Sequence, residues 1–243
     1  MISISALHKS YGKYQVLKGI DLTIENGTVL GLVGPNACGK TTLMKCLLGL
    51  AHFSKGKVII QNLDIEMGTE YRRMIGYMPQ NPDFPGNLQV REILEMMEDL
   101  RGESAKFKND LIEYFSLEDS LDKTFEVLSG GTKQKVAAVL AFMFEVPILI
   151  LDEPTVGLDP VSGAKFKELV RTRAKSGATI IIVSHVLSEL EQVATDIAFI
   201  FEGKVLATTS LFELKKKAGD SAGNSSLENA VMEIFLEKSR GSK

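Results

Sequence analysis

The segment Gly34–Thr41 constrains the fold of this chain more than any other feature, because it reads G-x-x-x-x-G-K-[ST]. It follows Thr28–Val33, an apolar run that is typical of a strand buried on both faces. It precedes a helical pattern whose recurring face carries Leu43, Leu47 and Leu50. Glycines let the backbone close around an anion with its N–H groups pointing inward. The sequence therefore predicts a P-loop, the turn that grips the phosphates of a nucleotide.

The predicted P-loop gives its polar side chains separate roles. Lys40 should reach the β- and γ-phosphates, and Thr41 should bind Mg²⁺ through its hydroxyl. The helix that begins near Gly39 adds the positive end of its dipole. ATP and Mg²⁺ are therefore the expected cofactors. The residues expected to contact ATP are Gly34, Pro35, Asn36, Ala37, Cys38, Gly39, Lys40, Thr41 and Thr42.

A second candidate element is the apolar strand Ile148–Asp152, which is followed directly by Glu153. Open α/β sheets bind ligands at the carboxyl ends of their strands. Asp152 suits Mg²⁺, usually through water, and Glu153 suits a general base for the attacking water. An apolar strand that ends in two acids is a weak signal alone, but together with a P-loop it predicts nucleotide hydrolysis.

The third element is Leu128–Gln134, which reads LSGGTKQ and opens a helical pattern. The N–H groups and the dipole of that helix start make a second anion site, and Ser129 would also serve as the helix N-cap. Two phosphate-binding helix starts in one small chain predict a shared nucleotide. A P-loop kinase or a GTPase switch would also explain the first two elements, but neither accounts for LSGGTKQ.

With these motifs in this order, residues 1–209 resemble the nucleotide-binding domain of ABC transporters. The resemblance implies that LSGGTKQ is the family signature, usually LSGGQ, with Thr132 in place of Gln. Ser129, Gly130 and Gly131 would then bind the ATP that the P-loop of a partner domain holds.

The same resemblance assigns four further residues. Gln80, in the stretch GYMPQ, matches the glutamine that senses Mg²⁺, takes part in catalysis and faces the membrane subunit. Asp159, in GLDP, matches the D-loop at the nucleotide. His185 matches the catalytic switch histidine that contacts the γ-phosphate, and Tyr11 stands where the family stacks an aromatic ring on adenine.

The P-loop departs from the family pattern GxNGAGK[ST]T at two positions. Ala37 stands where Gly is usual, and Cys38 stands where Ala or Ser is usual. If position 37 needs a positive φ, Ala there costs about 1 kcal/mol or more. We expect weaker or slower ATP handling from this change, but no loss of function, because Gly39, Lys40 and Thr41 are intact.

The stretch after Gln80 forms, in the family, the groove that receives a short helix of the membrane subunit. Phe84 is the aromatic residue of that stretch, and large apolar side chains dominate interface energies. Two interpretations stay open: Phe84 anchors the helix of the partner, or it packs into the core of this chain.

Strand and helix patterns alternate along most of the chain, which predicts an α/β fold with parallel strands. The resemblance makes it a P-loop NTPase with an ABC-type core sheet, an antiparallel β subdomain and a helical subdomain inserted at about residues 86–145. The ATP-binding domain should span residues 1–218, followed by a flexible linker at 219–226 and an amphipathic helix at 227–238. Glu202-Gly203 between two apolar runs predicts a tight hairpin.

Composition limits the partners. The 243 residues carry a formal net charge of -3, so no nucleic acid is expected. No stretch is apolar for the roughly 18 residues that a membrane span needs. An integral membrane subunit must therefore be a separate chain, and we expect this protein to be cytoplasmic, peripheral on the inner face of the cell membrane through that partner.

These observations predict an ATP-hydrolysing motor subunit of an ABC transporter. One P-loop and one signature per chain require a second copy or a related ATPase chain. The sequence is similar to stand-alone ATPase chains of bacterial exporter-type systems and also to the ATPase of copper-site maturation in nitrous-oxide reductase systems. The alternative is a non-transport ABC ATPase that acts on ribosomes or DNA. The contacts to any substrate belong to the membrane partner, so the sequence does not name it.

Overall fold

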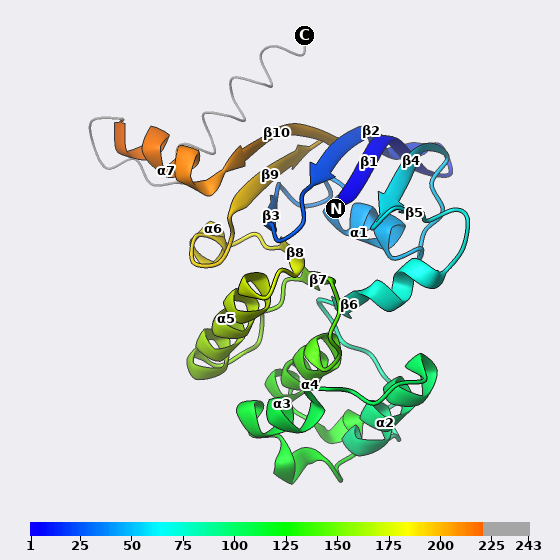
Figure 1. The fold of residues 1–243 in the computed structure, drawn as a ribbon, viewed down its shortest axis with the longest axis vertical. Coiled ribbons are helices and arrows are strands. Elements are labelled where there is room, and N and C mark those ends of the chain that lie inside the picture. Colours follow the sequence, from blue (N-terminus) through cyan, green and yellow to red (C-terminus); the bar gives the residue numbers. More distant parts are fainter. Residues whose placement is uncertain (221–243) are drawn as a thin grey trace. The chain divides into compact units, whose positions relative to one another are not determined.

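The computed structural model describes residues 1–220, and the chain divides into two compact units (Figure 1). Unit 1 contains Met1–Tyr71 and the described residues from Ile181 onward, whereas unit 2 contains Arg72–Ile180. Both units combine helices with strands, and the strands pair in both directions. The predicted α/β fold with antiparallel and parallel sheets is therefore confirmed.

An antiparallel sheet of four strands forms one part of unit 1. Its strand order is β2-β1-β4-β5. Leu22 and Ile24 of the second strand are buried, and Asp21 and Thr23 between them are exposed, which is the alternation of a half-buried strand. The bounds of these strands are β1 (Ile2–Tyr11), β2 (Tyr14–Ile24), β4 (Lys55–Ile60) and β5 (Leu63–Asp64).

A second set of strands in unit 1 includes a parallel pair. β3 (Val29–Val33) runs parallel to β9 (Asp196–Phe201), and β10 (Lys204–Ser210) returns antiparallel to β9. The two residues between β9 and β10 are Glu202 at φ 46 and Gly203 at φ 80. Two successive left-handed residues match the mirror-image turns that favour two-residue hairpins. The predicted tight hairpin is present.

Three helices complete unit 1: α1 (Lys40–Leu47), α6 (Leu187–Leu190) and α7 (Leu211–Asp220). α7 includes the first two residues of the predicted linker at 219–226. The remainder of that linker and the predicted helix at 227–238 lie outside the described residues.

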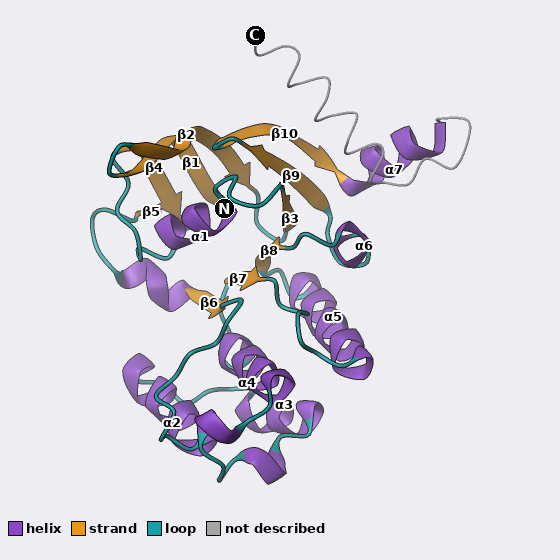
Figure 2. Cartoon of the chain, turned by 180° about the vertical axis from the view of Figure 1, so that it is seen from behind, coloured by secondary structure: helices purple, strands orange, loops and turns teal. Residues whose placement is uncertain are grey.

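Unit 2 is mostly helical, as the purple ribbons of Figure 2 show. Its strands β6 (Ile75–Met78) and β7 (Ile148–Asp152) are parallel, and β8 (Thr179–Val183) contains the boundary between the units. The α-helices are α2 (Val90–Arg101), α3 (Lys108–Phe115), α4 (Gly130–Phe142) and α5 (Pro160–Lys175). Short 3₁₀ turns occupy Glu118–Ser120 and Phe125–Val127 in this unit. A further 3₁₀ turn, Glu70–Met74, contains the chain position at which unit 2 begins.

Helix α4 is the centre of packing in unit 2, where it contacts α2, α3 and β6. Gly76 of β6 lets the helix approach closely, because a Cβ atom there would lie 2.2 Å from the carbonyl oxygen of Ala141. Every residue from Val136 to Phe144 is buried. The strand that leads to Gln80 and the helix that carries Gly130 and Gly131 are thus fixed against each other. Within residues 1–220, no helix is both long and apolar enough to cross a membrane.

Candidate functional site

The predicted P-loop leaves β3 and enters α1 through glycines that the packing requires. A Cβ atom on Gly34 would lie 2.2 Å from the carbonyl oxygen of Ile200. Gly39, at φ 112, is the N-cap residue of α1, and no side chain caps that helix. No acidic residue lies in its first turn. A helix start without a side-chain cap presents N–H groups and a positive dipole end to an anion.

Lys40 is held inside the loop by the loop's own backbone. Its Nζ atom donates to the carbonyl oxygens of Gly34 at 2.6 Å and Pro35 at 3.0 Å, and only 8% of the residue is exposed. Cys38 Sγ lies 3.9 Å from the same Nζ atom. A cation therefore lies at the start of α1, the end of a helix whose dipole attracts anions.

Ala37 and Cys38, the two departures from the family pattern, occupy constrained positions. Ala37 has φ 61, so this position does adopt the left-handed backbone for which glycine is favoured. Cys38 is 5% exposed, and a Cβ atom on Gly34 would lie 2.7 Å from its Sγ atom. The thiol fills the space beside Gly34.

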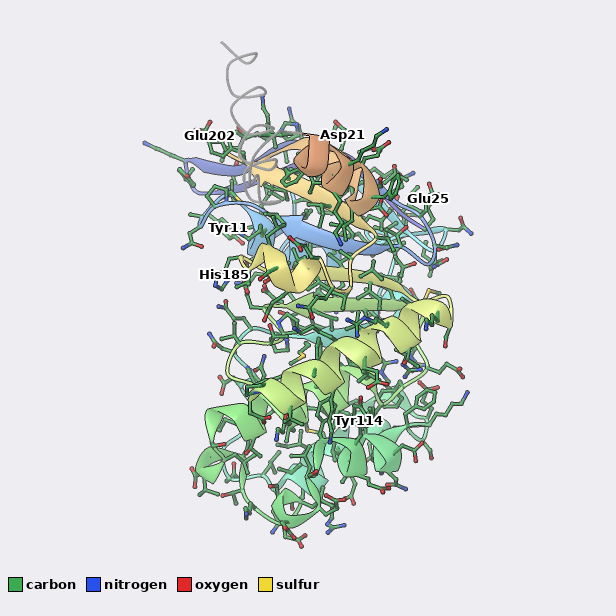
Figure 3. All side chains as sticks on the ribbon, turned by 90° about the vertical axis from the view of Figure 1, so that its left-hand side faces the viewer. Tyr11, Asp21, Glu25, Tyr114, His185 and Glu202 are labelled. Carbon is green, nitrogen blue, oxygen red and sulfur yellow. The ribbon has the colours of Figure 1, made fainter. Side chains whose placement is uncertain are left out.

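Tyr11 and His185, both labelled in Figure 3, are exposed residues of unit 1. Tyr11 ends β1, is 48% exposed, and has the ammonium group of Lys9 4.5 Å from its ring centroid. A cation on the ring is a favourable contact. An adenine base, which is flat, would be a second kind of partner for the ring. His185 follows β8 in a turn where Ser184 Oγ accepts from the N–H of Val186 at 3.1 Å.

In unit 2, the strand register brings Gln80 and the acidic pair to one edge. β6 and β7 run parallel with Met78 opposite Leu151, so the residues that follow both strands leave the sheet on the same side. Gln80 is exposed, whereas Asp152 and Glu153 are 3% and 8% exposed. This is the carboxyl edge, where open α/β sheets bind ligands.

The oxygen atoms at this edge fit Mg²⁺. That cation prefers carboxylate, carbonyl and water oxygens, usually with one or two carboxylates and substrate phosphates. Asp152 offers the carboxylate and Gln80 an amide oxygen, while the hydroxyl of Thr41 belongs to unit 1. Burial and the negative charge of Asp152 together raise the pKa of Tyr77. Among residues 1–220, no three His, Cys, Asp or Glu side chains cluster as a metal site.

Glu153 has an unusual backbone. Its φ is 48, a left-handed conformation that costs about 1–3 kcal/mol in a residue other than glycine. Its carbonyl oxygen accepts from the N–H of Val156 at 3.2 Å, which closes a turn directly after β7. Such strain clusters at functional sites, and here it falls on the predicted general base.

The LSGGTKQ motif forms the start of α4. Ser129 is the N-cap residue, and its Oγ atom accepts from the N–H of Thr132 at 3.2 Å. No acidic residue lies in the first turn of the helix, and a Cβ atom on Gly130 would meet nothing within 4 Å. Ser129 and Gly130 are both exposed. The start of α4 is therefore open to an anionic partner.

The first two turns of α4 are fixed to the segment that follows Glu153. A Cβ atom on Gly131 would lie 2.9 Å from the carbonyl oxygen of Gly157, so the backbones approach closely. Gln134 Nε2 donates to the carbonyl oxygen of Pro154 at 3.3 Å. The structure thus brings the predicted signature and the predicted D-loop together within unit 2.

Asp159 is held by its own helix. Its carboxylate accepts from the N–H of Ser162 at 2.9 Å and from Ser162 Oγ at 2.6 Å, and Lys135 Nζ lies 3.3 Å away. Hydrogen bonds from Ser162, and then Lys135, hold the pKa of Asp159 well below its usual range. Sequence reasoning missed Lys135 and Ser162. The spacing of Asp159, Pro160 and Ser162 is an N-terminal capping signal that identifies Ser162, but Lys135 has no comparable signal.

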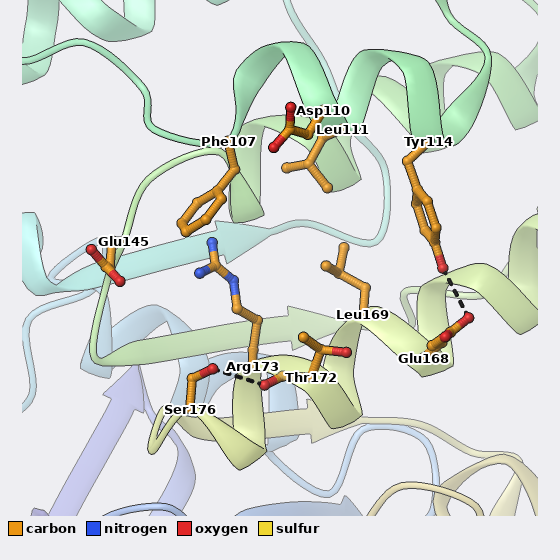
Figure 4. Close-up of a pocket in the computed structure, with 10 residues that line it drawn as sticks. All are labelled: Phe107, Asp110, Leu111, Tyr114, Glu145, Glu168, Leu169, Thr172, Arg173 and Ser176. Carbon is orange, nitrogen blue, oxygen red and sulfur yellow. Dashed lines mark hydrogen bonds between the residues drawn. The ribbon is translucent and has the colours of Figure 1, made fainter.

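A separate cavity of about 330 Å³ lies between α3 and α5 (Figure 4). Arg173 crosses it, stacks on the Phe107 ring at 3.9 Å, and donates to the carbonyl oxygens of Phe142 and Phe144. Tyr114 donates to Glu168 at 3.2 Å on the opposite side. None of the predicted site residues lines this cavity.

Comparison with known proteins decides the family. The family model described as "ABC transporter" matches residues 17–156. The lantibiotic transport ATP-binding protein SrtF of Streptococcus pyogenes is 34% identical over 206 residues, which cover 85% of this chain and 89% of the relative. The chain belongs to the ABC transporter family. It is an ATP-binding subunit of that family, whose ATP hydrolysis is coupled to transport.

Further ABC proteins are similar over most of the chain. The bacitracin transport ATP-binding protein BcrA of Enterococcus faecalis is 35% identical over 226 residues, covering 89% of this chain and 71% of the relative. A structure of the ATP-binding subunit of an ABC transporter shares 28% identity with a TM-score of 0.88, covering 97% of this chain and 99% of that one. A dimeric ATP-binding cassette in a post-hydrolysis state, bound to ADP and Pi, shares 25% identity with a TM-score of 0.76, covering 87% and 99%.

Proposed function

We propose that this chain is the motor of a bacterial export system and that its predicted site residues carry out the ATPase cycle. The observation that carries the proposal is the P-loop geometry. Lys40 is held within 3.0 Å of two loop carbonyl oxygens, at the start of a helix that no side chain caps. That arrangement suits the β- and γ-phosphates of ATP.

Each predicted residue has a role that its surroundings support. Lys40 pairs with the β- and γ-phosphates, and Thr41 in unit 1 is a proposed Mg²⁺ ligand. In unit 2, Gln80 and Asp152 are the proposed Mg²⁺ ligands. Bound there, the cation would neutralise charge on the phosphate oxygens during transfer. Glu153 would orient the attacking water and take its proton, since it follows Asp152 at the carboxyl edge of β7.

The remaining predicted residues contact adenine, the γ-phosphate or the nucleotide near the D-loop. Tyr11 stacks on adenine, and its exposed ring has room for a flat partner. His185 contacts the γ-phosphate from the turn after β8. Asp159 acts on the nucleotide through the backbone of the D-loop, because its carboxylate already caps α5 by accepting from Ser162 and pairs with Lys135.

The active form is a dimer, either of two copies or with a related ATPase chain. The chain has one P-loop and one LSGGTKQ motif, and a signature that binds ATP across an interface needs a partner. The exposed, acid-free start of α4 at Ser129 and Gly130 supports this assignment. A relative of similar length forms a dimer with ADP and Pi bound.

Export is the direction that the relatives favour. SrtF and BcrA are named for lantibiotic and bacitracin transport, so the proposed cargo is a compound of the lantibiotic or bacitracin type. A separate integral membrane subunit would bind it and hold this chain at the inner face of the membrane. The names of these two relatives do not mention copper. A role in copper-site maturation stays a prediction from the sequence.

Replacing Lys40 with Ala tests the nucleotide site. Without the cation the phosphate charge is uncompensated, so binding of a fluorescent ATP analogue should weaken by at least tenfold and hydrolysis should be lost. Lys45→Ala is the matched control, because Lys45 is an exposed lysine of the same helix. Equal affinity of Lys40→Ala and the unaltered chain would refute the assignment of the P-loop.

Expression with a neighbouring membrane-protein gene tests the direction. The pair should raise the resistance of a sensitive bacterium to bacitracin-type or lantibiotic-type compounds, and Lys40→Ala should abolish that gain. If neither the unaltered chain nor Lys40→Ala changes the resistance when expressed with the membrane protein, the export proposal is contradicted. The ATPase assignment would not be affected.

A further inference from the structure

Thr132 is the signature residue that departs from the family pattern, and it contacts the predicted phosphate ligand directly. Its Oγ1 atom lies 2.8 Å from Ser129 Oγ, and its backbone N–H donates to the same oxygen at 3.2 Å. We propose that Thr132 is a positioning residue that orients the Ser129 hydroxyl toward the phosphate bound at the signature. This inference rests on the proposed function, in which Ser129 binds the ATP of the partner chain.

Counting hydrogen bonds shows how the orientation arises. A serine hydroxyl has one hydrogen to donate and two lone pairs to accept with. The Thr132 N–H takes one lone pair. When the Thr132 hydroxyl donates into the second, Ser129 has no acceptor capacity left and its hydrogen is free to point outward. A phosphate oxygen only accepts hydrogen bonds. It therefore favours this arrangement over the reverse one, in which the Ser129 hydroxyl donates to Thr132.

The chain of hydrogen bonds that runs from Thr132 through Ser129 to phosphate is called the relay below. It also makes Ser129 a better donor. Hydrogen bonds in a chain polarise one another, so a hydroxyl that accepts two bonds donates more strongly. A charged acceptor such as phosphate forms bonds roughly twice as strong as neutral ones. The sequence of donors is therefore Thr132 to Ser129 to phosphate, and removing the first member should weaken the last contact without removing it.

The surroundings keep the pair in place. Ser129 and Thr132 lie one turn apart, at the N-cap and the third residue of α4. The next turn is held by Gln134, which donates to Pro154, and by Lys135 beside Asp159. The backbone under the two hydroxyls is thus fixed, and the change that a Thr132 variant makes is confined to the hydroxyl.

Four variants of the full chain test the relay. Thr132→Val keeps the branched shape and the backbone cap but removes the hydroxyl, Thr132→Ser keeps the hydroxyl, and Ser129→Ala removes the phosphate ligand. The fourth is the double variant Ser129→Ala with Thr132→Val. The measurements are kcat and KM for Mg-ATP hydrolysis, the affinity of each chain for a fluorescent ATP analogue, and the melting temperature.

The relay predicts a pattern that a purely structural role does not give. Thr132→Val should lower kcat by about fivefold, the size expected for one hydrogen bond. Thr132→Ser should stay within twofold of the unaltered chain. In the Ser129→Ala background, Thr132→Val should have no further effect, because the relay has lost its second member. Thr132→Val should leave the analogue affinity unchanged, because the P-loop lies in the other unit. It should also leave the melting temperature unchanged, because the backbone cap is kept. Both chains that carry Ser129→Ala lose that cap and should melt at a lower temperature, so Thr132→Val is compared within each background.

Three outcomes would overturn the inference. The first is a Thr132→Val chain with the kcat of the unaltered protein while Ser129→Ala is impaired. The second is a Thr132→Val loss that persists in the Ser129→Ala background, or one that follows a drop in melting temperature. The third is a Ser129→Ala chain with full activity, which would refute the proposed role of the signature itself and so separates that failure from failure of the relay.

Discussion

Ala37 places a strained residue inside the phosphate-binding loop. Its φ of 61 lies in the left-handed region, which costs an L-residue about 1–2 kcal/mol. Glycine would avoid that cost, but it loses about 0.5–1 kcal/mol more conformational entropy on folding. The difference leaves a modest penalty at a position where the loop must keep its shape to bind phosphate.

Ala37→Gly should therefore stabilise the chain by about 0.5–1 kcal/mol, which raises the melting temperature by about 1–4 °C for a protein of this size. Ala164→Gly is the matched control, because Ala164 is an exposed residue in the interior of α5. There the same change should cost about 1 kcal/mol. Thermal melting of both variants checks the prediction, and a lower melting temperature for Ala37→Gly would contradict it.

At the scale of elements, the sequence predicts those strands and helices whose pattern is unbroken. β7 has the predicted bounds, because a continuous apolar run ends at an acidic pair. The sequence pattern does not predict β1, because register shifts between Ile4 and Leu7, with Ala6 at φ 45, interrupt its alternation. α4 begins at Gly130, directly after the predicted Ser129 cap, because that cap outweighs the poor helix propensity of the two glycines.

The contacts between elements are the part of the site that sequence reasoning could not supply. The motifs, their order and the residues at the strand end are visible in the sequence because each is local. The approach of Gly131 to Gly157 and the pairing of Lys135 with Asp159 join segments about 25 residues apart. They depend on how α4 packs, which no spacing encodes. The Thr132 hydroxyl contact is local, but the family comparison drew attention only to its departure from Gln.

Phe84 packs partly against the protein, and its docking to the membrane subunit stays a prediction. Its ring packs edge-to-face on Phe125 at 5.3 Å between centroids, and Phe125 is 3% exposed while Phe84 is only half-buried. Phe84→Ala should cost about 1–2 kcal/mol of stability, less than the 3–5 of a fully buried Phe. ATP binding should survive, and assembly with the membrane subunit should weaken.

Phe212→Ala is the control for this prediction, because Phe212 of α7 is 78% exposed. It should leave both melting temperature and assembly unchanged. The measurements are thermal melting, binding of an ATP analogue, and co-purification with the membrane subunit. Normal assembly of Phe84→Ala would rule out docking at this residue, and complete unfolding would make Phe84 a core residue only.

At the scale of the whole molecule, one chain supplies half of each proposed composite site. It contains one P-loop and one signature, and the signature helix start is exposed and free of acidic residues in its first turn. If each ATP lies between the P-loop of one chain and the signature of another, nucleotide should drive association. Hydrolysis should then reverse it, because loss of the γ-phosphate removes the shared ligand.

Glu153→Gln should separate association from its reversal. The substitution keeps the size of the side chain at a strained, buried position but removes the base, so hydrolysis should fall by about 10²–10⁴-fold while ATP still binds. The chain should then accumulate as an ATP-dependent dimer in size-exclusion chromatography with light scattering.

Glu202→Gln is the matched control, because Glu202 is also left-handed, at φ 46, but is exposed in the β9–β10 turn. It should hydrolyse ATP normally and stay monomeric at steady state. A Glu153→Gln chain that stays monomeric with Mg-ATP and hydrolyses at the normal rate would show that Glu153 is not the base.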